Sequence, residues 1–154
     1  MNGYIEMDVS AFIKGLDLAV KEMQQAAERG MAKAVLQLMD DTIEEYPGIP
    51  QDEDVLRASG SAFVNNRLVG TSNDNGIGQP IVQSEDAIGH GEIVGAVIFG
   101  TPYAAYQHEG VRYDGSHVVK NYTTAGTGPK FLESKLFHNT DKYLEIIAEE
   151  IANA

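Results

Sequence analysis

The chain has no cysteine, no tryptophan and few basic residues: 11 lysines and arginines stand against 23 aspartates and glutamates in 154 residues. Without cysteine, disulfides, thiolate zinc sites and cysteine nucleophiles are excluded. A net charge of −12 argues against a broad nucleic-acid-binding surface, because phosphate neutralisation needs clustered lysine and arginine. No stretch resembles a signal peptide or is long and apolar enough to cross a bilayer, so we expect no membrane partner.

Hydrophobic residues make up 43% of the chain, too many for intrinsic disorder. The length suits one domain, so we expect a single domain over residues 1–154.

Residues 10–46 carry apolar side chains at steps of three and four, which predicts one long amphipathic helix. A helix of that length measures about 55 Å and overhangs a compact domain of this size. Two interpretations follow: either Gly30 breaks the helix in two, or part of the helix packs on a neighbouring subunit.

Short β-prone runs separated by turn residues fill residues 57–100, with Asn65-Asn66 as a tight turn. The spacing favours an antiparallel meander or a pair of hairpins. The expected strands are Ser59–Val64, Arg67–Ser72, Pro80–Ser84 and Glu92–Phe99.

Residues 110–128 are expected to form a long variable loop, and the pattern of residues 129–152 predicts a final helix with Pro129 in its first position. A further short helix is expected over Pro102–Glu109. The fold class is therefore α+β: a long N-terminal helix, a small antiparallel sheet of about four strands, and a C-terminal helix packed on the sheet.

Evidence for catalysis is almost absent from the sequence. There is no GxSxG motif and no P-loop, and His108-Glu109 does not begin an HExxH motif. A small hydrolase or metal enzyme built from His108, Glu109, Asp114 and His117 is a minor alternative. We assign no catalytic, metal or cofactor-binding residue and expect no cofactor.

Two groups of residues are candidates for contacts. Aromatic side chains cluster around the loop, where a rigid ring with a polar tip suits protein interfaces. These candidate interface residues are Tyr103, Tyr106, Tyr113, His117 and Tyr122. Seven acidic residues near the end of the long helix are expected to form a solvated face, a wall that repels DNA, or a surface that fits a basic partner. They are Asp40, Asp41, Glu44, Glu45, Asp52, Glu53 and Asp54.

Three short motifs follow one another along the chain. They are Val55-Leu56-Arg57-Ala58-Ser59, the segment FGTPYAAYQHEG at residues 99–110, and the segment GPKFLESKL at residues 128–136. With the long helix before them and the terminal helix after them, this order resembles the tail-completion (head–tail joining) proteins of long-tailed bacteriophages. The resemblance covers nearly the whole chain, from about Ser10 to Ile151.

The resemblance implies a structural protein of the phage neck and no enzymatic activity. It implies a homo-oligomeric ring of six copies, with twelve as the alternative, assembled in the host cytoplasm and carried in the virion. The implied neighbours are head-closure, tail-terminator or tail-tube proteins, with DNA passing nearby without specific binding. The alternative hypothesis is a stand-alone module that binds a host or phage protein.

Overall fold

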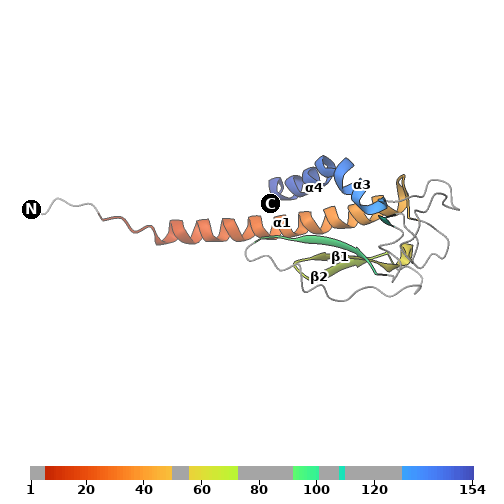
Figure 1. Cartoon of the computed structure of the whole chain (residues 1–154). Helices are drawn as coiled ribbons and strands as arrows, with labels where there is room; N and C mark the ends of the chain where they lie inside the picture. Colours follow the sequence, from red (N-terminus) through yellow and green to blue (C-terminus); the bar gives the residue numbers. More distant parts are fainter. Residues whose placement is uncertain (1–5, 50–55, 73–91, 101–107, 110–129) are drawn as a thin grey trace, which may run out of the picture.

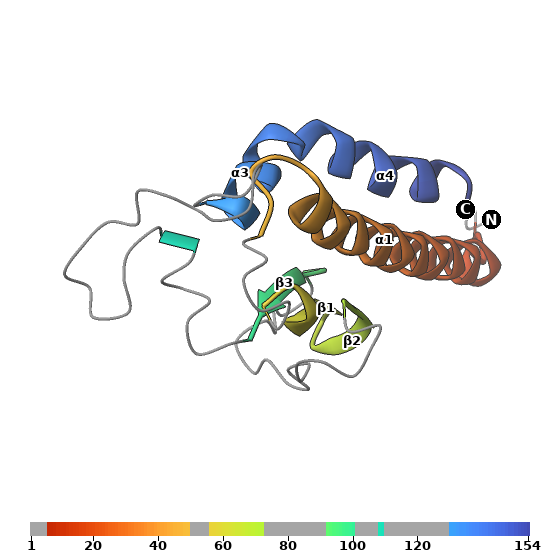
Figure 2. The ribbon, with the colours of Figure 1, turned by 90° about the vertical axis from the view of Figure 1, so that its right-hand side faces the viewer.

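The structure is a computed structural model that describes residues 6–49, 56–72, 92–100, 108–109 and 130–154. The predicted α+β class is confirmed. A long N-terminal helix lies between a small antiparallel sheet on one side and two C-terminal helices on the other (Figures 1 and 2).

Helix α1 (Ser10–Glu44) is a continuous helix of 35 residues, about 52 Å long. Good helix formers (alanine, leucine, methionine, glutamine and glutamate) fill most of its positions. The helix ends where Glu45 turns to an extended conformation, two residues before Pro47. Its N-terminal half projects well beyond the rest of the described chain, as the sequence-based length predicts (Figure 1).

Gly30 does not break the helix. A Cβ atom at this position would lie 2.8 Å from the Cα and 3.1 Å from the carbonyl oxygen of Ile147. Gly30 therefore allows the backbones of two helices to approach closely, and of the two sequence-based interpretations the helix break is wrong.

Three strands form the sheet: β1 (Gly60–Val64), β2 (Arg67–Thr71) and β3 (Gly95–Phe99). Asn65 and Asn66 join β1 to β2 with positive φ angles of 47° and 64°, which matches the predicted tight turn. The register shifts between Ala62 and Phe63, the position of a β-bulge.

The predicted meander is wrong for the described strands, because β3 pairs with β1 instead of β2 and the order is β2-β1-β3. β1 is buried at every residue, whereas β2 begins exposed. The described sheet has three strands instead of four, and the expected strand Pro80–Ser84 lies outside the described residues.

The C-terminal region contains two helices instead of the single one predicted over residues 129–152. They are α3 (Phe131–His138) and α4 (Thr140–Ala152), separated at Asn139. The hydroxyl of Thr140 donates to the carbonyl of Leu136 at 2.6 Å, and the Asn139 side chain donates to Glu45 at 3.1 Å. Because Lys130 is the N-cap of α3, Pro129 is not the first helical residue.

The core has three parts. Val35 and Met39 of α1 pack on Ala62 and Val64 of the sheet. On the opposite side of α1, Ala34 and Leu38 pack on Tyr143 of α4, so the expected packing of the C-terminal helix on the sheet is wrong for α4 (Figures 1 and 2). The third cluster contains Ile49, Leu56 and Phe131. Phe131 of α3 also contacts Phe99 of the sheet edge-on, and the centroids of the two rings are 6.3 Å apart.

Candidate functional site

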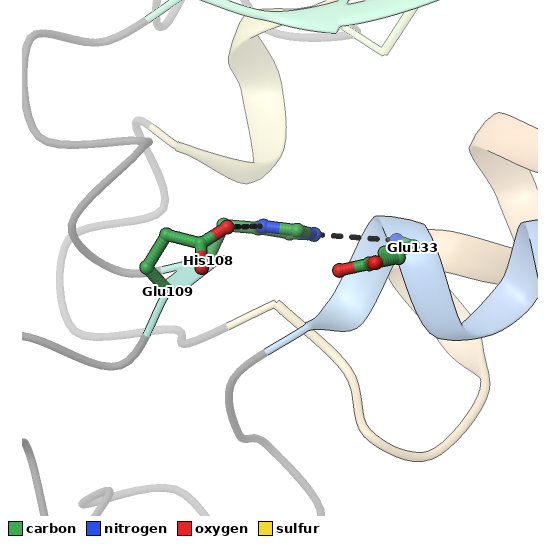
Figure 3. A group of neighbouring side chains, drawn as sticks. All are labelled: His108, Glu109 and Glu133. Carbon is green, nitrogen blue, oxygen red and sulfur yellow. Dashed lines mark hydrogen bonds and ion pairs between the residues drawn. The ribbon is translucent and has the colours of Figure 1, made fainter.

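Within the described residues, one group of side chains has the composition of a metal site. His108, Glu109 and Glu133 each offer a ligand atom, and these atoms lie within 4.8 Å of one another (Figure 3). The first two residues form a short helical segment, and Glu133 lies in the first turn of α3. The sequence analysis singled out His108 and Glu109 but not Glu133.

The ring of His108 is held by both of its nitrogens. The backbone N–H of Glu133 donates to Nε2 at 3.2 Å, so Nδ1 carries the proton and faces Glu109 Oε1 at 3.1 Å. The carbonyl of His108 accepts from the backbone N–H of Lys130 at 2.6 Å, and its ring contacts Phe131 edge-on at 5.0 Å. His108 therefore caps the first turn of α3 from a distant part of the chain.

Lys130 forms ion pairs with both carboxylates of this group. Its Nζ lies 2.5 Å from Glu109 Oε2 and 3.0 Å from Glu133 Oε2. Hydrogen bonds from Lys130 and then His108 hold the pKa of Glu109 below its ordinary value, and the same carboxylates raise the pKa of Lys130. A divalent cation has to compete with this ammonium group and with the bond at His108 Nε2. The arrangement is that of a joint between two segments, not of an open metal site.

The three sequence motifs meet beside this joint. Leu56 and Phe131 are 3% and 1% exposed and share one apolar cluster, and His108 packs on Phe131. The hydroxyl of Ser59 donates to the Leu56 carbonyl at 2.7 Å and accepts from the backbone N–H of Gly100 at 3.2 Å. We call this set of Leu56, Ser59, Gly100, His108 and Phe131 the motif junction.

Lys135, which the sequence analysis did not single out as a functional residue, is buried beside the motif junction at 2% exposure. Its Nζ donates to the carbonyls of Pro47 at 2.7 Å and Phe131 at 2.9 Å. Burial lowers the pKa of Lys135. Because these backbone acceptors satisfy the ammonium group, Lys135 ties α3 to the chain that follows α1.

The acidic patch is smaller than the sequence suggests. Asp40, Glu44 and Glu45 are exposed, with Glu44 3.6 Å from Arg57 and Glu45 3.9 Å from Lys142. Asp52, Glu53 and Asp54 lie outside the described residues.

Asp41 does not belong to this patch, because it is buried at 4% exposure. Its carboxylate accepts from Lys142 at 2.9 Å, Tyr143 at 2.8 Å and Gln37 at 2.8 Å. Burial by itself raises the pKa of Asp41, but these hydrogen bonds outweigh it and hold the pKa below its ordinary value. Helical spacing puts Asp41 on the same face as Leu38, so the periodicity could have predicted its burial.

The candidate interface residues Tyr103, Tyr106, Tyr113, His117 and Tyr122 lie outside the described residues, as does Asp114. The overhang that the length of the helix predicted is the N-terminal half of α1, which is exposed. Phe12, Leu16 and Met23 are 68%, 49% and 54% exposed, although their spacing is that of a buried face.

None of the described helices combines the length and hydropathy needed to cross a membrane. Comparison with known protein families, curated proteins and solved structures finds no match for this chain.

Proposed function

We propose that this protein is a structural component of a bacteriophage neck, which joins the tail to the head connector as part of a ring around the DNA channel. The observation that carries the proposal is the motif junction. The sequence motifs that resemble tail-completion proteins are far apart in the chain, yet Leu56, His108 and Phe131 lie together in the fold. Residues that the members of a family have in common for structural reasons are expected to pack together in this way.

The chemistry of the described residues agrees with an architectural role. Titratable groups at and beside the motif junction are bonded to backbone groups or to opposite charges, as His108 and its neighbour Lys130 illustrate. Such pairs hold segments of the chain in place. In this proposal the protein works through its shape and its interfaces, in a ring of six copies or, alternatively, twelve.

Charge supports the same assignment. Asp40, Glu44 and Glu45 are exposed on a chain with a net charge of −12. Acidic residues beside a DNA channel repel phosphates, so DNA slides past without being retained. In the proposed ring this surface faces the channel.

Deletion of the gene from the phage or prophage that encodes it tests the proposal. Negative-stain microscopy of the resulting particles is expected to show DNA-filled heads beside separate tails. A plasmid copy of the wild-type gene is expected to restore joined virions, which excludes an effect on neighbouring genes. Joined, infectious virions without the protein contradict the proposal and favour a stand-alone module that binds a host or phage protein.

A further inference from the structure

The N-terminal half of α1 is an arm with no partner among the described residues. We define the arm as Ser10–Gln25, in which every residue is exposed. This first part of α1 extends beyond the sheet and the C-terminal helices (Figure 1). The exposed large apolar side chains of the arm are Phe12, Ile13, Leu16, Leu18, Val20 and Met23. All of these except Leu18 lie on one face of the helix, because they recur at steps of three and four.

This face continues the face that α4 covers farther along the same helix. At about 100° per residue, Phe12, Leu16 and Met23 lie within about 40° of the direction of Ala34. Ala34 and Leu38 pack on Tyr143, and Gly30 lies against Ile147. α4 ends at Ala152, whereas the apolar face of α1 continues to the start of the helix. The arm therefore presents a helix-packing surface in line with an existing helix–helix interface.

The charge of the arm favours a second copy of the chain as the covering partner. The arm contains two basic and two acidic residues, so its formal charge is zero in a chain of net charge −12. Lys14 and Lys21 lie on the side opposite Leu16, and Asp17 is four residues before Lys21, which supports the helix. The rest of each chain carries the net negative charge, so these parts of two copies repel each other. Two arms can approach without placing like charges at the contact.

We propose that the arms of two copies pack side by side in antiparallel orientation. In this register Phe12 meets Met23 of the partner subunit, and Leu16 meets Ala19 of the partner subunit. The large side chain of Leu16 is thereby matched by a small one, which suits close helix packing. The end of each α4 marks where the partner's arm stops. The interface is two-fold and isologous, so each copy contributes the same surface.

The inference goes beyond the proposed function and does not rest on it, because it concerns the free chain in solution. Two short helices cover less area than the roughly 1,200–2,000 Å² of standard stable complexes. We therefore expect association that depends on concentration. Deletion of the gene tests the neck assignment and self-association of the purified chain tests the pairing, so either can fail without the other.

Sedimentation equilibrium of the full chain and two variants tests the pairing. The wild-type chain is expected to reach the mass of two copies as its concentration rises. Leu16→Glu places a charge in the seam and is expected to weaken association by about a hundredfold or more. Leu18→Glu is the matched control, because Leu18 is also exposed, at 58%, but lies on the other side of the arm. It is expected to associate like the wild type.

Both substitutions lie outside the core, so circular dichroism is expected to show folded chains. A wild-type chain that stays monomeric at all concentrations overturns the proposal. So does an association that Leu16→Glu leaves unchanged or that Leu18→Glu weakens equally. Binding of a monomeric wild-type chain to anionic lipid vesicles, lost in Leu16→Glu, assigns the face to a membrane surface instead.

Disulfide trapping tests the antiparallel orientation of the two arms. Because the chain has no native cysteine, only the introduced cysteines can form a disulfide. Phe12→Cys and Met23→Cys chains are mixed and oxidised. Antiparallel pairing predicts a disulfide between the two different chains. A chain with Phe12→Cys alone is expected to stay uncrosslinked, because its two sulfurs lie about 16 Å apart along the seam, too far for a disulfide. Efficient crosslinking of Phe12→Cys to itself indicates parallel arms and overturns the proposed register.

Discussion

At the scale of single residues, two glycines of α1 have opposite surroundings. A Cβ atom at Gly30 would meet the backbone of Ile147, whereas a Cβ atom at Gly15 would meet nothing within 4 Å. Replacement of either glycine by alanine therefore gains helix propensity, but only at Gly30 does the added methyl group overpack the contact.

We predict that Gly30→Ala lowers the free energy of unfolding. Alanine gains about 1 kcal/mol of helix propensity, but separating α1 from α4 costs about 1–3 kcal/mol. Because backbone atoms cannot rotate away, we expect a net loss of about 1 kcal/mol, measured by urea unfolding. Gly15→Ala is the matched control and is expected to leave the urea midpoint unchanged or raise it. Equal effects of the two substitutions contradict this account of Gly30.

His108 joins two segments that are distant in sequence, and its removal tests the joint. His108→Ala leaves the Glu133 N–H without its acceptor and opens space beside Phe131. We expect a loss of about 1–2 kcal/mol in the free energy of unfolding, as for other lost helix caps. Glu109→Gln is the control, since it removes an exposed ion pair and keeps the ring of His108. We expect it to change the urea midpoint far less than His108→Ala.

At the scale of elements, α1 is predicted to have two halves of different stability. The half from Gly30 to Asp41 is covered by α4 and the sheet, whereas the arm is exposed. Backbone amides exchange slowly only where surrounding packing opposes local opening. In the Leu16→Glu variant, which lacks the proposed pairing, we expect rapid hydrogen exchange in the arm and slow exchange between Gly30 and Asp41. Uniform protection along α1 contradicts this division.

The elements also show what the sequence can predict. The periodicity of α1 fixes its length within two residues at each end, because one strong pattern extends over many turns. The break at Asn139 could not be predicted from the pattern, because apolar residues at helical spacing continue across it, whereas in α3 Lys135 is buried and Phe137 is exposed. The pairing of β3 with β1 depends on contacts between strands more than 30 positions apart. Local patterns do not encode such pairings.

The candidate site was predictable only in part for the same reason. His108 and Glu109 are recognisable as residue types, but the partner of His108 is the N–H of Glu133, 25 residues later. The apolar stripe of the arm has the periodicity of a buried face, and only the overhang of so long a helix indicated that part of it is uncovered. Helix propensity and apolar spacing indicate that a helix face needs to be covered, but they do not indicate which molecule covers it.

At the scale of the whole molecule, paired carboxylates make stability depend on acid. The pKa of Asp41 lies below its ordinary value of 3.8, and hydrogen bonds from Lys130 and Lys33 hold the pKa values of Glu109 and Glu150 below 4.5. The unfolded chain therefore binds protons more readily than the folded chain. The free energy of unfolding is expected to have its full value near neutral pH and to fall as the pH drops below about 4.5.

Urea unfolding at a series of pH values measures this loss, and Asp41→Asn is the variant that tests its origin. The amide cannot titrate, so the acid limb of the stability curve is expected to flatten even though the variant is less stable at neutral pH. Protonation also relieves the self-repulsion of a chain with a net charge of −12, and this opposes the loss at mildly acidic pH. An acid limb as steep in Asp41→Asn as in the wild type assigns the loss to other carboxylates.

The same excess of acid governs how the whole molecule meets DNA. With 23 acidic and 11 basic residues, each chain repels a phosphate backbone, and in the ring that we propose this repulsion adds up over the copies. We predict that the purified protein does not retain duplex DNA in a gel-shift assay, even at low salt where electrostatic attraction is strongest. Proteins that neutralise phosphates show an affinity that falls steeply with salt, by a log–log slope of about −0.9 for each phosphate contacted. Tight binding with such a slope contradicts the proposed repulsive channel wall.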